Sequence, residues 1–157
     1  VPISVVISNG CKFFIQFALF LVSYLLLAGP NYPFNWTLWL LILVLLQMAI
    51  LGLGIGLLIS ALVTKYRDLS LLMSFLVQFW MYATPVIYPF SQVPDKYKFF
   101  FLLNPMTTIL ELVRHAFFGA KMIEIHYWLF SWGETILILL IGMIVFNRIE
   151  KRSMDLI

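Results

Sequence analysis

Long apolar segments dominate the pattern of hydrophobic and polar positions along this sequence. Residues 36–63 carry no charge over 28 positions, and their only polar side chains are Thr37, Gln47 and Ser60. A helix rises about 1.5 Å per residue and the bilayer core is about 30 Å thick, so about 20 such residues suffice to cross it. This segment is therefore predicted to be a membrane-spanning helix.

Three further apolar stretches share this pattern, and the segments between them contain helix breakers such as Pro30 and Pro33. We therefore predict an all-α integral membrane protein with a single transmembrane domain over residues 1–157. Its four spans are expected at about residues 3–28, 36–63, 69–88 and 128–146.

A fifth segment, residues 97–119, is aromatic and apolar but is interrupted at Asn104 and Pro105. Each half is too short to cross a bilayer, and backbone at membrane depth must be helical or buried in protein. We predict two short re-entrant helices on the outer side. Glu111 is expected to pair with either Arg114 or His115 on the second of them.

The composition agrees with a membrane protein, since 63% of residues are hydrophobic and 11% are charged, against about a quarter charged in soluble domains. The net charge of +3 does not indicate nucleic-acid binding. Because Cys11 is the single cysteine, an internal disulfide or a cysteine metal cluster is excluded. A metal site at Glu111, His115 and His126 is disfavoured by their spacing. The start at Val1 without Met suggests a fragment.

Positive residues near span ends mark the cytoplasmic side of a membrane protein. Alternating spans would place the N-terminus, the loop at residues 64–68 and the tail at residues 147–157 on one face. That face carries Lys12, Lys65, Arg67, Arg148, Lys151 and Arg152. The C-terminus is therefore predicted to be cytoplasmic and residues 89–127 to be external.

Small residues recur every four positions in the second span, at Gly52, Gly56 and Ser60. This spacing predicts one helix face that a neighbouring helix can approach closely. No Walker-type phosphate-binding sequence occurs in the chain, so any ATP hydrolysis must come from another polypeptide or from missing sequence.

The third span has a polar stripe with aromatic neighbours. The residues concerned are Ser70, Ser74, Phe75, Gln78, Phe79, Trp80 and Tyr82. Such a stripe is predicted to face protein or water, either as hydrogen bonding between helices or as the wall of a solute pathway. Pro85 and Pro89 should break this helix near the outer surface.

Two ionisable residues lie inside predicted spans, Lys12 and Glu134. Lys12 can extend its side chain to the cytoplasmic headgroups, and Glu134 lies close to the outer aromatic belt. We therefore expect shallow or paired positions for both rather than a proton relay, which would need further titratable partners.

The sequence resembles the transmembrane subunits of type-2 ABC exporters that move O-antigen, capsule or teichoic-acid polymers across the bacterial inner membrane. The resemblance runs from Gly52 onward. Its motifs are Tyr66-Arg67-Asp68, Thr84-Pro85-Val86-Ile87-Tyr88-Pro89, Leu103-Asn104-Pro105-Met106, Arg114, Gly119 and Asp155. In this family each subunit has six spans, so the sequence would correspond to the last four.

The resemblance implies roles for these motifs. Residues 97–119 look like an outer gate, with Asn104, Pro105, Met106, Arg114 and Gly119 as its marker residues. Tyr66, Arg67 and Asp68 look like part of a cytoplasmic coupling loop. Aromatic residues of the third span, together with Tyr88, look like a channel lining.

The resemblance further implies a non-enzymatic permease that exports a lipid-linked glycan through a pore between two copies in a lipid bilayer. A separate ATPase subunit would bind ATP and magnesium, and the chain itself would need no cofactor. A drug or small-lipid exporter is the alternative within transport. A multispan enzyme acting on lipid-linked sugars is the alternative outside it, and would need convergent acids, bases or a metal.

Overall fold

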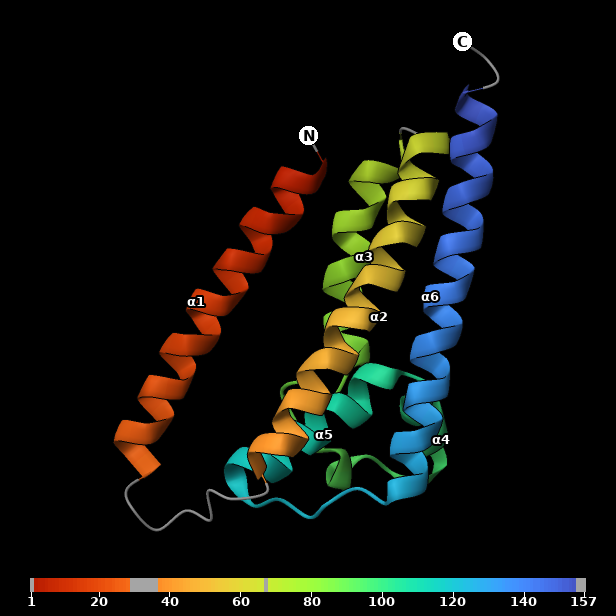
Figure 1. Ribbon diagram of the computed structural model, residues 1–157. Helices are drawn as coiled ribbons and strands as arrows, with labels where there is room; N and C mark the ends of the chain where they lie inside the picture. The colour runs from red at the N-terminus through yellow and green to blue at the C-terminus, as the bar shows by residue number, and fades with distance from the viewer. Residues whose placement is uncertain (1, 29–36, 67, 155–157) are drawn as a thin grey trace. The chain divides into compact units, whose positions relative to one another are not determined.

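The computed structural model describes residues 2–28, 37–66 and 68–154, and all regular structure in these ranges is helical (Figure 1). The elements are α1 (Pro2–Ala28), α2 (Thr37–Lys65), α3 (Leu69–Ala83), the short 3₁₀ helix η1 (Phe90–Gln92), α4 (Asp95–Leu102), α5 (Pro105–Phe118) and α6 (Ile125–Met154). The predicted all-α class is confirmed.

The chain divides into two compact units, Val1–Trp36 and Thr37–Ile157. The first unit contains the single 27-residue helix α1. On this helix Lys12 and Gln16 are exposed, and Ser23 Oγ donates a hydrogen bond of 2.8 Å to the carbonyl of Leu19 on the preceding turn. The apolar stretch predicted at residues 3–28 is thus a continuous helix.

Two helices are long and apolar enough to cross a membrane among the residues described in side-chain detail, over Trp39–Lys65 and Ile125–Lys151. Two further apolar helical stretches, Phe14–Leu26 and Leu71–Ala83, are shorter. The structure therefore supports two of the four predicted spans by length and composition. α6 extends through Met154, so the predicted tail at residues 147–157 begins as a continuation of this helix.

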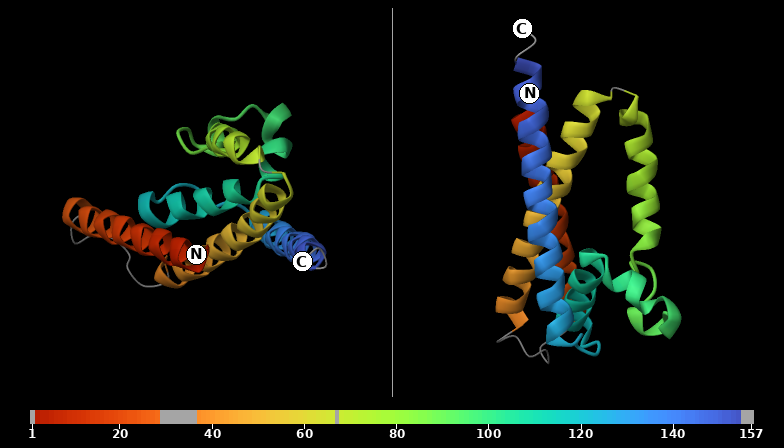
Figure 2. Two further views of the ribbon diagram at one scale, coloured as in Figure 1. Left: turned by 90° about the horizontal axis from the view of Figure 1, so that it is seen from above. Right: turned by 90° about the vertical axis from the view of Figure 1, so that its right-hand side faces the viewer.

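The second unit is centred on α2 and α6, which run side by side with α5 across one end of the pair (Figures 1 and 2). One cluster of buried residues in the described part of this unit comprises Leu40, Val44, Leu51, Ile109 and Leu112. The first three recur at helical spacing on α2 and the other two lie on one face of α5. Together they fix α5 against α2.

The closest approach of α2 and α6 occurs at Gly54 and Gly142. A Cβ atom at Gly142 would lie 2.6 Å from the carbonyl oxygen of Gly54, and one at Gly54 would lie 2.9 Å from the Leu139 backbone. Gly52 and Gly56, where we predicted close packing, are exposed, and no atom lies within 4 Å of their Cβ positions. Within the described residues, helix packing therefore uses a different face of α2.

α3 ends at Ala83, five residues before the predicted end of the third span. The reason is Pro85, since proline disfavours helical backbone at the preceding residue and offers no amide donor. Thr84 accordingly adopts an extended conformation. Figure 2 shows α3 diverging from α2 away from the turn that joins them.

Two short helices joined at Asn104 and Pro105 are present as predicted, as α4 and α5. The Asn104 side chain caps α5 by accepting a hydrogen bond of 3.1 Å from the Met106 amide, and Pro105 occupies the first turn, where its missing donor costs nothing. Gly119 ends α5 in the left-handed conformation at φ 63°. Asn104, Pro105 and Gly119 are therefore the residues that delimit this helix.

Candidate functional site

α3 presents an exposed aromatic face. Phe75, Phe79 and Tyr82 follow the spacing i, i+4, i+7 and are 69%, 70% and 69% exposed. Ser74 and Gln78 are also exposed, and Ser74 Oγ donates to Leu71 O within the same helix. The side chains of Gln78 and Tyr82 form no hydrogen bond with a described residue, so within the described residues this stripe does not join α3 to another helix.

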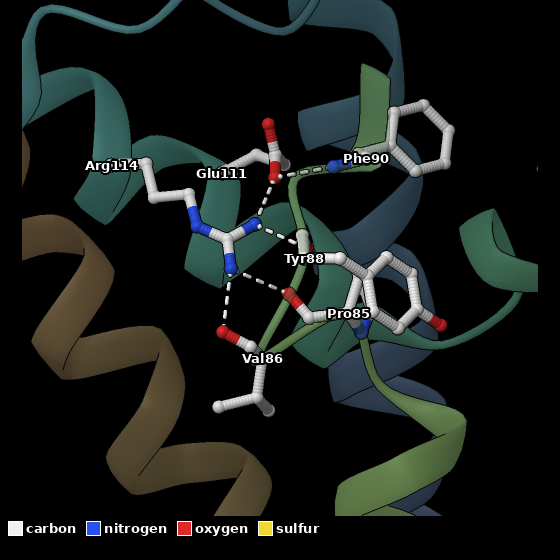
Figure 3. A network of polar contacts seen from close by, with 6 residues as sticks. All are labelled: Pro85, Val86, Tyr88, Phe90, Glu111 and Arg114. Carbon is white, nitrogen blue, oxygen red and sulfur yellow. Dashed lines mark hydrogen bonds and ion pairs between the residues drawn. The ribbon is translucent and has the colours of Figure 1, made fainter. Parts of the chain in front are cut away.

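The end of α3 is held by Arg114 of α5 (Figure 3). Its guanidinium donates to the carbonyl oxygens of Pro85, Val86 and Tyr88 at 2.8, 2.7 and 3.0 Å. These carbonyls follow the break in α3, where no helical amide is available to them. Arg114 thus supplies hydrogen-bond donors to three carbonyls beyond the end of α3.

Glu111 completes this network. Its Oε1 accepts a hydrogen bond of 2.6 Å from Arg114 Nη1 and another of 3.1 Å from the Phe90 amide. The Glu111 side chain is 9% exposed and that of Arg114 is 19% exposed. The predicted pairing of Glu111 with Arg114 is confirmed, and we name Glu111, Arg114 and their backbone partners at Pro85, Val86, Tyr88 and Phe90 the outer clamp.

A second polar contact supports the outer clamp. Asn104 Nδ2 donates to Thr84 Oγ1 at 2.8 Å, and Thr84 Oγ1 donates to the Trp80 carbonyl at 2.9 Å. The Tyr88 ring packs edge-on against Phe101 of α4, with ring centres 6.2 Å apart. Tyr88 was predicted to be part of the channel lining. Its contacts place it at the junction of α3 with α4 and α5.

Gln47 forms a buried polar node between α2 and α6. Its amide nitrogen donates to Ser131 Oγ at 2.9 Å and to Thr135 Oγ1 at 3.3 Å, and its oxygen accepts from the Trp128 indole at 3.0 Å. Ser131 Oγ in turn donates to the carbonyl of Pro105 at the start of α5. A buried amide must satisfy its donors and acceptor, and Gln47 does so with side chains of α6. Through Ser131 this network also reaches α5, so it links three helices.

Two residues of the predicted coupling motif, Tyr66 and Asp68, are described between α2 and α3. Tyr66 and Asp68 are exposed, and the Tyr66 carbonyl accepts a hydrogen bond of 3.0 Å from the Leu69 amide. The Lys65 ammonium lies 4.9 Å from the centre of the Tyr66 ring. Arg67, the third residue of the motif, lies outside the described residues.

The residues considered for metal or enzyme chemistry do not converge. Glu111 belongs to the outer clamp, His115 Nδ1 lies 2.6 Å from the Ala120 carbonyl, and His126 contacts the exposed Glu124 at 3.2 Å. Within the described ranges, no three His, Cys, Asp or Glu side chains are grouped as metal ligands would be.

An exposed ion pair between Lys98 and Asp95 on α4, at 2.5 Å, lowers the pKa of Asp95 through the hydrogen bond and the lysine charge.

Sequence reasoning missed the partners of Gln47 and the backbone acceptors of Arg114. Gln47 was visible as an isolated amide in an apolar run, a signal that indicates a buried hydrogen-bonded site. Its partners lie more than 80 positions away, however, and nothing in the local pattern identifies them.

The second unit contains two helices long and apolar enough to cross a membrane, and the outer clamp holds the end of its proline-terminated helix α3. These features indicate a helical membrane protein. The sequence profile of the ABC-2 type transporter family matches residues 2–118. The chain belongs to this family of transporter permease subunits, as its motifs had suggested.

Two proteins from Klebsiella pneumoniae, each named O-antigen export system permease protein RfbA, are 22% identical over all 157 residues, which correspond to 60% of each relative. A protein of the same name from Myxococcus xanthus is 32% identical over 123 residues, covering 77% of this chain and 46% of the relative. The chain thus spans about 60% of the length of the first two relatives.

Proposed function

We propose that this chain forms part of the channel of an ATP-driven exporter that moves a lipid-linked polysaccharide across the bacterial inner membrane. Family membership and the O-antigen export names of the relatives support the proposal. In this chain the proposal rests on the aromatic face of α3. The rings of this face are exposed, so packing among the described residues does not explain why they are aromatic.

The aromatic face suits a moving polymer. Aromatic rings offer large apolar faces that contact sugar rings without demanding one pattern of hydrogen bonds. Ser74 and Gln78 on the same helix offer polar groups to sugar hydroxyls. Trp80 is 45% exposed on another side of this helix. In this proposal two copies of the full-length protein face each other across the pore, each lining it with α3.

The outer clamp gives α5 a mechanical role in the proposal. Because Arg114 binds three carbonyls just beyond α3, a displacement of α3 must carry the start of the outer segment and α5 with it. We propose that α4 and α5 are re-entrant helices that form the outer gate. Met106, which is half-buried against the core, would transmit this motion to α2.

The remaining parts of the proposal concern topology and partners. α1 and α3 would be the other two of four spans, with the turn at Tyr66 and Asp68 and the C-terminus in the cytoplasm. That turn, together with Arg67, would contact a separate ATPase subunit that binds ATP and magnesium. Exposed side chains at Tyr66 and Asp68 are compatible with such a contact.

Replacing the aromatic rings of α3 should reduce export more than it reduces the stability of the protein. In a strain lacking the gene, full-length protein carrying Phe79→Ala, Trp80→Ala or Tyr82→Ala should restore less surface glycan than wild type, at similar membrane abundance. The reason is that these side chains are exposed and contribute little packing energy within the chain. Surface glycan and accumulated lipid-linked glycan are the quantities to measure.

Trp39→Ala is the matched control, since Trp39 is an equally exposed aromatic residue at 73% but lies on α2. Tyr82→Phe should keep most export if the ring face matters. Normal export by all three alanine variants at normal abundance would remove α3 from the pathway. Unchanged surface glycan in the deletion strain would refute the proposed function itself.

Cysteine labelling tests the topology. With Cys11 replaced by Ser, a cysteine at Lys65 should react only with reagents that reach the cytoplasm, and a cysteine at Lys98 only with reagents applied outside. Lys65 is the last residue of α2, and Lys98 lies within α4 with a side chain that is 37% exposed. Reaction of both cysteines from the same side would rule out the proposed arrangement of spans.

A further inference from the structure

The side of α6 that faces the joint between α4 and α5 carries an open apolar groove of about 490 Å³. This volume lies within the range of about 300–1,000 Å³ typical of small-molecule sites. Its lining residues are Leu103, Phe130, Gly133, Glu134, Leu137 and Ile138. A second hollow of about 270 Å³ shares Leu103 and Phe130 with it and leads on toward the first turn of α6.

The groove contains one carboxyl group in an apolar lining. Oε2 of Glu134 is buried and accepts no hydrogen bond from any described residue. Such an oxygen is costly to leave unpaired, particularly in a helix long and apolar enough to cross the bilayer. The groove therefore offers apolar surface along most of its length and a single acceptor for a donor or cation.

The position of Glu134 on α6 decides at what depth this acceptor lies. Tyr127, Trp128 and Trp132 precede it, and such aromatic residues gather at the membrane interface. Side chains on a helix tilt toward its N-terminus, so the carboxyl of Glu134 is directed back toward this aromatic end. With α6 spanning the bilayer as proposed, the acceptor would lie near the headgroups, and Leu137 and Ile138 would continue the groove into the hydrocarbon layer.

We propose that this groove binds a phospholipid whose headgroup carries a primary ammonium group, with the ammonium donating to Glu134 and an acyl chain lying along Leu137 and Ile138. Charge complementarity selects this occupant. A carboxylate attracts an ammonium group, and the apolar remainder of the lining suits an acyl chain. The lining includes no residue of α3, so the site differs from the aromatic face of that helix.

Gly133 provides access to the groove. No atom lies within 4 Å of the position that its Cβ would occupy, so the backbone of α6 is open to a ligand at this turn. A larger side chain there would enter the groove without displacing the described packing. This makes Gly133 a site at which the groove can be filled by mutation.

The experiment compares lipids retained by the purified full-length protein. Native mass spectrometry after exchange into equal amounts of phosphatidylethanolamine and phosphatidylcholine should show about tenfold preferential retention of the ethanolamine lipid, the ratio expected from one charge-assisted hydrogen bond. Phosphatidylcholine is the matched probe, because its headgroup has the same charge but no N–H donor. Glu134→Gln should abolish the preference, and Glu150→Gln on the same helix should preserve it.

Gly133→Leu should reduce retention of both lipids while leaving the protein's oligomeric state unchanged. Equal retention of the two lipids by wild type, or an unchanged preference in Glu134→Gln, would overturn the proposal. Dissociation of a dimer by Gly133→Leu with unchanged lipid retention would also overturn it, since the groove would then be covered by a second copy of the chain.

Discussion

Arg114→Ala is expected to destabilise the folded protein and to uncouple α3 from α5. The substitution leaves the carboxylate of Glu111, which is 9% exposed, without its cation. It also removes the donor from three backbone carbonyls beyond α3. Removing one partner of a buried pair costs about 3–5 kcal/mol, and we expect the lower end because Arg114 is 19% exposed. Thermal unfolding of the purified full-length protein measures this loss.

The exposed pair Asp95 and Lys98 is the matched control, because it has the same i, i+3 spacing on α4. Lys98→Ala should cost less than about 1 kcal/mol, as exposed pairs do. Arg114→Lys should retain the charge but lose most of the backbone contacts, since lysine lacks the planar fork of donors. Equal stability of Arg114→Ala and Lys98→Ala would show that the outer clamp does not hold α3.

Gly142→Ala is expected to have the second large effect, by forcing α2 and α6 apart. Its Cβ would lie 2.6 Å from the carbonyl oxygen of Gly54, a backbone atom that cannot move without shifting the whole helix. Overpacking of this kind costs about 1–3 kcal/mol. The separation would also strain the bonds from Gln47 to Ser131 and Thr135, so unfolding temperature and membrane abundance should both fall.

Gly52→Ala and Gly56→Ala, on the facing helix α2, are the controls. No atom lies within 4 Å of either Cβ position, so both variants should keep the unfolding temperature or raise it slightly through better helix propensity. If Gly142→Ala proved as stable as Gly52→Ala, the close contact of α2 with α6 would be wrong. Loss of dimer in Gly52→Ala or Gly56→Ala would show that this face packs closely against a second copy.

Local sequence signals accounted well for the elements of the second unit. Apolar runs predicted α2 and α6, the Asn104-Pro105 pair predicted the junction of α4 and α5, and the prolines after Thr84 predicted a break near the end of α3. These features are local, because proline geometry, helix capping and apolar length act within a few residues. The end of α3 was misplaced by five residues, since the apolar composition continues after the helix has stopped.

The sequence by itself determined that this is a helical membrane protein with an interrupted third apolar segment, and its motifs indicated the family. Only the tertiary structure decided which face of α2 packs. Gly52, Gly54 and Gly56 are all small, but the position of α6 alone selects Gly54. The structure likewise decided that Gln47 meets Trp128, Ser131 and Thr135, and that Arg114 binds the carbonyls beyond α3. Such pairs join residues far apart in the chain, and periodicity contains no information about which distant groups will satisfy a buried donor.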